Sequence, residues 1–150
     1  MFNFSSIQAY RHALKKGEAS CVSVTEHYLA AIQQRSHLNA FIEVYAEEAL
    51  QRARELDEKR ASGGEAAGRL HGVVIGIKDV LCYKNHPVTA ASRILKGFTA
   101  TYHATVIEKL LAEEAIIIGS LNCDEFAMGS TNENSAYGNV LNYRDETRVP

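Results

Sequence analysis

The sequence predicts an α/β fold in which N-terminal helices pack on part of a mixed, partly parallel sheet. Two observations support this class: apolar residues recur at helical spacing through residues 1–62, and short β-branched runs stand at residues 70–78 and 115–119 with a helical pattern between them. A strand, a helix and a second strand form a βαβ unit, whose strands lie parallel after a right-handed crossover. We therefore expect a helical layer at 1–62, a βαβ unit within 69–138 and an irregular tail at 139–150.

Three helices are expected in the helical layer. The first is capped by Ser6 and stops at Gly17, a residue that accepts a left-handed conformation. The second starts at the capping-box spacing of Ser23 and Glu26, and the third runs from about residue 46 to 61. The positions expected to be buried are Ile7, Tyr10 and Leu14 in the first helix, Val24, Tyr28, Ala31 and Ile32 in the second, and Ala49, Leu50, Ala53 and Leu56 in the third.

The third helix also carries two oppositely charged pairs at i,i+4 spacing, Glu48 with Arg52 and Glu55 with Lys59. Such pairs mark a solvent-facing side, so we assign these helices a packing role rather than a catalytic one. The glycine-rich residues 62–68 follow as a flexible connector.

The run at 70–78 is typical of a strand buried on both faces, and it ends at Lys78. Residues 80–102 show no regular pattern, and a helix follows whose inner side carries Val106, Ile107, Leu110 and Leu111. A short helical turn is expected near Asp124, before a polar loop at 128–135. Ligands of open α/β sheets bind at the carboxyl ends of the strands, where Lys78 and residues 120–124 would meet.

The composition excludes several classes of protein. A formal net charge of −2 without any run of like charges leaves no electrostatic footprint for DNA or other independent nucleic-acid binding. The three cysteines, Cys21, Cys82 and Cys123, are odd in number and scattered, which favours a reducing compartment and hence the cytoplasm. No apolar stretch reaches the roughly 20 residues that span a membrane, and residues 1–10 do not resemble a signal peptide.

Lys78 admits two interpretations. Its apolar neighbours Ile77, Val80 and Leu81 would strip water from the ammonium group, which favours the neutral amine and would make it a base near neutral pH. Neighbouring hydroxyls would then be candidate nucleophiles. The alternative is that Lys78 ends a strand in water and pairs with Asp79 or another carboxylate, as most lysines are exposed.

Other polar residues give weaker signals. A phosphate loop is excluded because Asp79, and not Ser or Thr, follows the lysine. Cys82 and His86 lack the second pair that a zinc site needs, and Cys123 is expected to be a small buried residue. Structural alternatives stand beside each remaining candidate: charge compensation at a helix start for Glu125 and satisfaction of the loop backbone for Ser130, Thr131 and Ser135.

Three stretches together resemble the amidase signature family. They are Gly-Ile-Lys-Asp at residues 76–79, Ala-Thr-Val at 104–106, and the long run at 115–138. Within that run, residues 122–138 read Asn-Cys-Asp-Glu-Phe-Ala-Met-Gly-Ser-Thr-Asn-Glu-Asn-Ser-Ala-Tyr-Gly, which is long and specific. The likeness is closest to the glutamine-hydrolysing subunits of tRNA-dependent amidotransferases, and it covers the front portion of a longer α/β/α domain.

The resemblance implies a Ser–cis-Ser–Lys triad in which Lys78 is the catalytic base. It places Met128, Gly129 and Ser130 beside the substrate pocket for glutamine, with no metal and no cofactor bound directly by this portion. It also implies partners: amidotransferase subunits B and C, which would use ATP and Mg²⁺ to convert Glu-tRNA(Gln) to Gln-tRNA(Gln). No membrane and no DNA are implied.

In that family a Gly-Ser-rich segment supplies both serines, and it follows the motif that here ends at residues 148–150. We therefore expect these 150 residues to be a fragment that is inactive alone. Two alternatives stay open. One is another amide hydrolase of the same family, and the other is a non-catalytic α/β interaction module.

Overall fold

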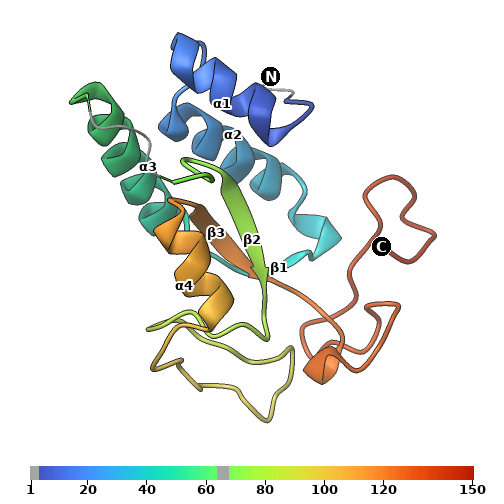
Figure 1. Cartoon of the computed structure of the whole chain (residues 1–150). Coiled ribbons are helices and arrows are strands. Elements are labelled where there is room, and N and C mark those ends of the chain that lie inside the picture. Colours follow the sequence, from blue (N-terminus) through green and yellow to red (C-terminus); the bar gives the residue numbers. More distant parts are fainter. Residues whose placement is uncertain (1–3, 64–67) are drawn as a thin grey trace. The chain divides into compact units, whose positions relative to one another are not determined.

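The computed structural model describes residues 4–63 and 68–150, which divide into two compact units. The first unit is built from the described parts of Met1–Gln33, Tyr45–Ile75 and Lys109–Ile118, and the second from Gln34–Val44, Gly76–Glu108 and Gly119–Pro150. Helix α4 and strands β2 and β3 each contribute residues to both units (Figure 1).

Helix α1, Ile7–Lys16, begins and ends where the sequence predicts. The Ser6 side chain accepts a hydrogen bond from the Ala9 N–H at 3.1 Å, and Gly17 closes the helix at a φ of 71°. Tyr10 and Leu14 are buried as expected. Ile7 is expected beside them but is 47% exposed, because it stands in the first turn, at the open end of the helix.

Helix α2, Cys21–Gln34, starts earlier than the predicted capping box. Ser20 and Ser23 exchange two hydrogen bonds, each backbone N–H donating to the other's hydroxyl at 3.0 Å. The prediction that Ser23 starts the helix is therefore wrong, and Ser20 precedes the first turn. Val24 is buried as expected, whereas Tyr28 is 44% exposed.

Helix α3, Ala46–Ala61, has the predicted bounds, and its positions Ala49, Ala53 and Leu56 are no more than 1% exposed. Its charged residues pair differently from the prediction. Arg52 pairs with Glu55 at 3.3 Å, and Lys59 pairs with Glu114, which lies far along the chain. Most of the predicted connector at 62–68 lies outside the described residues.

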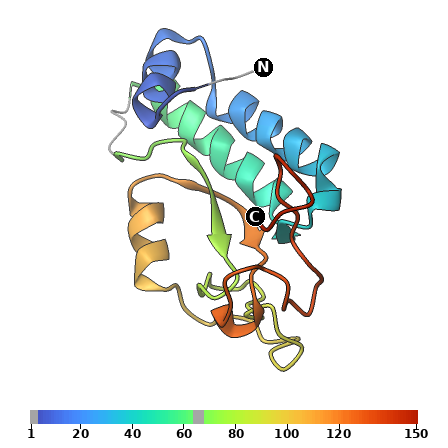
Figure 2. The same cartoon turned by 90° about the vertical axis from the view of Figure 1, so that its right-hand side faces the viewer.

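The sheet has three strands, β1 (Phe41–Val44), β2 (Val74–Lys78) and β3 (Ile116–Leu121), in the order β1-β3-β2 (Figure 2). β1 runs antiparallel to β3, pairing Phe41 with Leu121 and Val44 with Gly119. On the other side, Ile116 N–H donates to the Val73 carbonyl and Asp79 N–H to the Leu121 carbonyl. The pairing advances in the same direction along both strands, so β2 and β3 are parallel and the predicted mixed sheet is confirmed.

β2 departs from the prediction in two respects. Residues 70–73 form a turn closed by a 2.8 Å hydrogen bond from Val73 N–H to the Leu70 carbonyl, so the strand begins only at Val74. β2 also stands at the edge of the sheet, and most of its residues are half-buried rather than covered on both faces. The central strand β3 is the one that is almost wholly buried.

The remaining elements are short. Helix α4 spans Thr105–Ala112, and single turns of 3₁₀-helix lie at Ser36–Leu38 and Glu125–Ala127, the second near the expected turn. Val106, expected on the inner side of α4, is 45% exposed, whereas Ile107 is fully buried. Within the described ranges, residues 80–102 and 139–150 contain no helix or strand, as predicted. None of the helices between residues 4 and 150, the gap at 64–67 aside, is long and apolar enough to cross a membrane.

Candidate functional site

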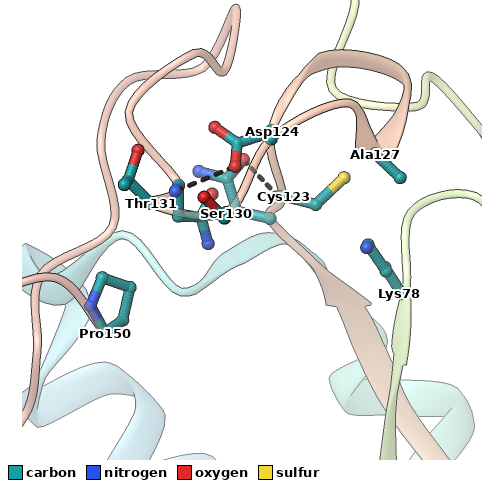
Figure 3. A pocket seen from close by; sticks show the side chains of 10 residues that line it. Lys78, Cys123, Asp124, Ala127, Ser130, Thr131 and Pro150 are labelled. Carbon is teal, nitrogen blue, oxygen red and sulfur yellow. Dashed lines mark hydrogen bonds between the residues drawn. The ribbon is translucent and has the colours of Figure 1, made fainter.

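A cavity of about 340 Å³ lies in the second unit, at the carboxyl ends of β2 and β3. Lys78 comes from the end of β2, and Cys123 and Asp124 come from the segment that follows β3. The loop residues Ala127 and 129–132 complete most of the wall (Figure 3). The structure therefore brings together the two segments that the parallel-strand argument predicted at one edge.

Lys78 points its amine into this cavity, toward Cys123 and Ala127 (Figure 3). Its side chain is exposed, so the expected desolvation by neighbouring apolar residues is wrong for this chain. The alternative pairing with Asp79 is not seen either. Asp79 is 2% exposed and takes its hydrogen bonds from Thr89, Ala91 and Ser120.

The loop beyond β3 is held by the Asp124 carboxylate. It accepts hydrogen bonds from the N–H groups of Asn132 and Asn134, both at 3.0 Å, and these bonds lower the pKa of Asp124. Gly129 lies against the same carboxylate. A Cβ added at Gly129 would come within 2.4 Å of the Asp124 carboxyl carbon, so only glycine fits without displacing the carboxylate.

Cys123 does not have the character of a nucleophile. It is 4% exposed, and burial raises the pKa of its thiol, an effect that the neighbouring Lys78 ammonium partly opposes. A thiol held in its neutral form is a poor nucleophile, in agreement with the predicted packing role.

The hydroxyl and carboxylate candidates divide between the loop and the cavity. Ser135 donates to the Asn122 side chain at 2.6 Å, and Glu125 accepts from Ser92 at 2.6 Å, so both serve the local structure. Ser130 and Thr131 line the cavity.

Two of the three predicted substrate-loop residues face the cavity. Gly129 and Ser130 line it, whereas the Met128 side chain is 83% exposed and does not contribute to the lining. Among the cavity residues that sequence reasoning missed, Asn132 has a buried Oδ1 without a hydrogen-bond partner in the described part of the chain. Its left-handed backbone, with φ of 59°, is one that asparagine adopts more readily than most residues, and this is the only signal in the sequence.

Comparison with known proteins decides the family. The family model described as Amidase matches residues 23–150, which is most of the chain. The chain belongs to the amidase family. The fold expected from the resemblance is thus confirmed, and the cavity at the sheet edge is a cavity of an amidase-family chain.

Relatives and solved structures agree with this assignment. The A-subunit of the glutamyl-tRNA(Gln) amidotransferase of Chlorobium phaeobacteroides (strain BS1) is 49% identical over 147 residues, which cover 98% of this chain and 31% of the relative. The native peptide amidase of Stenotrophomonas maltophilia superposes with a TM-score of 0.83 at 27% identity, covering 92% of this chain and 30% of that one. A protein from a complex described as vestigial and related to the origin of an s-triazine catabolic enzyme gives a TM-score of 0.87 at 33% identity, with 92% and 30% covered.

The amidase-family chain therefore spans about 31% of the length of the curated relative it matches. Among residues 4–63 and 68–150, no three His, Cys, Asp or Glu side chains come together as a candidate metal site.

Proposed function

We propose that the chain is the front portion of a glutamine-hydrolysing subunit of a tRNA-dependent amidotransferase. The observation that carries this proposal is the position of the Lys78 amine. It opens into a cavity whose opposite wall includes Gly129 and Ser130, the loop that the family resemblance associates with substrate. The relatives named as amidotransferase A-subunits support glutamine as the substrate.

In the proposed reaction Lys78 acts as the general base. The amine takes the proton of a bridging serine, which in turn takes the proton of the nucleophilic serine. The nucleophile attacks the side-chain amide carbon of glutamine, forms an acyl-enzyme and releases ammonia, and water then frees glutamate. An exposed amine suits this role only when further polypeptide covers the cavity, because a lysine in bulk water is protonated at neutral pH.

The proposal assigns the remaining steps to partners. Subunits B and C would receive the ammonia and use ATP with Mg²⁺ to convert Glu-tRNA(Gln) to Gln-tRNA(Gln). The chain itself would bind neither ATP nor the metal. Both serines of the proposed triad would come from a segment beyond Pro150, so the 150 residues alone would not hydrolyse glutamine.

The test is ammonia release from glutamine. The 150-residue chain is assayed alone and together with a polypeptide that supplies the rest of the family domain from a relative. We expect activity only in the combination, with a loss of about 10²- to 10⁴-fold for Lys78→Ala, the range attributed to general-base catalysis. Lys84→Ala, at an exposed lysine that does not line the cavity, is the matched control and should retain activity.

Release of ammonia by the chain alone would contradict the missing-serine proposal, and full activity of Lys78→Ala would contradict the role of the base. The two alternatives give different results. Another amide hydrolase would prefer other amides and ignore Glu-tRNA(Gln), whereas an interaction module would bind its partner equally well with Lys78→Ala and would show no activity in any combination.

A further inference from the structure

The residue after Lys78 is a buried carboxylate with an unusual set of partners. Asp79 is 2% exposed. Its Oδ2 accepts hydrogen bonds from Thr89 N–H at 3.2 Å, Thr89 Oγ1 at 2.5 Å and Ala91 N–H at 3.0 Å, and its Oδ1 accepts one from Ser120 Oγ at 2.9 Å. These four donors, all within the described part of the second unit, are neutral. A buried carboxylate must be satisfied, and here it is satisfied by hydrogen bonds that fix one specific turn.

That turn, residues 89–91, is one that the chain would not adopt unaided. Ala90 and Ala91 both have left-handed backbones, with φ of 51° and 53°. Such conformations persist in alanine only where the surroundings impose them. Asp79 imposes this one from two sides, since its backbone carbonyl also accepts the Ala90 N–H at 2.9 Å.

The same turn holds the cavity loop. The Ala90 carbonyl accepts the Phe126 N–H at 2.8 Å, and the Ala91 carbonyl accepts the Ala136 N–H at 2.9 Å. These two bonds flank the segment that contains Ala127, Gly129 and Ser130 of the cavity wall. Phe126 is itself left-handed, with φ of 52°, so this segment also depends on external bonds.

We propose that Asp79 is a positioning residue that sets the distance between the Lys78 amine and the cavity wall at residues 127–130. One residue carries the amine, and its neighbour anchors the turn from which the wall hangs. A displacement of about 1 Å between reacting groups can lower a catalytic rate about 10²-fold, so such an anchor matters to catalysis without touching substrate. This inference rests on the proposed glutaminase function.

The first test measures glutamine hydrolysis in the same combination of chain and complementing polypeptide. Asp79→Asn places an amide N–H₂ among donors and should lower kcat about 10²-fold. Thr89→Val removes the Thr89 hydroxyl and should have a smaller effect, whereas Thr89→Ser keeps it and should retain activity. Asp57→Asn is the matched control: Asp57 also accepts two backbone N–H groups, from Cys21 at 2.9 Å and Val22 at 3.0 Å, but it belongs to the first unit.

The second test does not depend on activity. Amide hydrogen exchange at Phe126 and Ala136 should be faster in Asp79→Asn and Thr89→Val than in the original chain, and unchanged in Asp57→Asn and Thr89→Ser. Unchanged exchange in Asp79→Asn, or an equal loss of kcat in Asp57→Asn at equal loss of stability, would overturn the inference. If the unmodified combination shows no glutaminase activity, the proposed function fails, and the exchange rates still decide whether Asp79 anchors the loop.

Discussion

At the residue scale, Glu114 is the most strongly perturbed carboxylate of the first unit. Its side chain is 8% exposed, it pairs with Lys59, and its Oε2 lies 2.6 Å from His71 Nδ1 and 3.2 Å from the Gly68 N–H. Burial by itself would raise the pKa of Glu114, but the hydrogen bonds from Lys59, His71 and Gly68 outweigh it and lower the pKa to about 2. One carboxylate thus joins α3, the turn before β2 and the turn before β3.

This depressed pKa predicts an acid-dependent stability. The folded pKa lies below the unfolded one, so the stabilisation is fully present above about pH 4.5 and is lost as the pH falls toward 2. Its upper bound is on the order of 3 kcal/mol. In urea unfolding of the chain between pH 6 and about 2.5, Glu114→Gln should be less stable at pH 6 and should show a flatter pH dependence. Glu58→Gln, at an exposed carboxylate of α3, should keep the original slope, and identical slopes for both variants would contradict the prediction.

At the scale of elements, the start of α2 shows how local chemistry fixes a helix end. Ser20 and Ser23 satisfy each other's N–H groups, and the Asp57 carboxylate accepts the next two, from Cys21 and Val22. All four belong to the first turn region, where N–H groups have no partner within the helix. A carboxylate there also interacts favourably with the helix dipole.

Replacing Ser20 by Ala should therefore destabilise the chain by about 1 kcal/mol, the usual cost of a lost N-cap. Chemical denaturation measures this directly. Ser62→Ala is a suitable control, since the Ser62 hydroxyl also bonds to a backbone group, the Lys59 carbonyl, but at a helix C-terminus where such a cap is worth less. A loss in Ser20→Ala no larger than that in Ser62→Ala would show that Asp57 alone suffices.

The same helix illustrates what the sequence can and cannot reveal. The bounds of α3 and α1 follow from apolar spacing and from a local cap and stop, so the sequence predicts them. The start of α2 is misplaced at Ser23 because Ser20 has no acidic partner three residues on, whereas its true partners are Ser23 and the distant Asp57. Interactions between residues far apart in the chain leave no local pattern.

The candidate site follows the same division. The parallel strands predict that Lys78 and the segment after β3 meet, and they do. The exposure of Lys78 and the inward-facing Asp79 cannot be predicted, because they depend on which loops cover each face of the strand end. The sequence indicates Asp79 only as an ion-pair partner, since nothing in it links this residue to the turn at 89–91.

At the scale of the whole molecule, the sheet has two open edges, one on β1 and one on β2. Val73 and Asp79 both bond to β3, and alternate residues of a strand face the same neighbour, so the N–H of Val74 faces the open side of β2. An unprotected edge strand is a template for pairing with another strand, from a second copy or from further polypeptide.

We therefore expect the chain to self-associate as its concentration rises, measured by sedimentation velocity. Val74→Pro removes an outward N–H at a position where an edge strand tolerates proline, so it should shift the population toward monomer while keeping the bonds to β3. Ile94→Ser is the control for association through exposed apolar side chains, because Ile94 is 79% exposed in the irregular segment at 80–102. Association that survives Val74→Pro but disappears in Ile94→Ser would place the contact on that segment and remove the edge of β2 from the explanation.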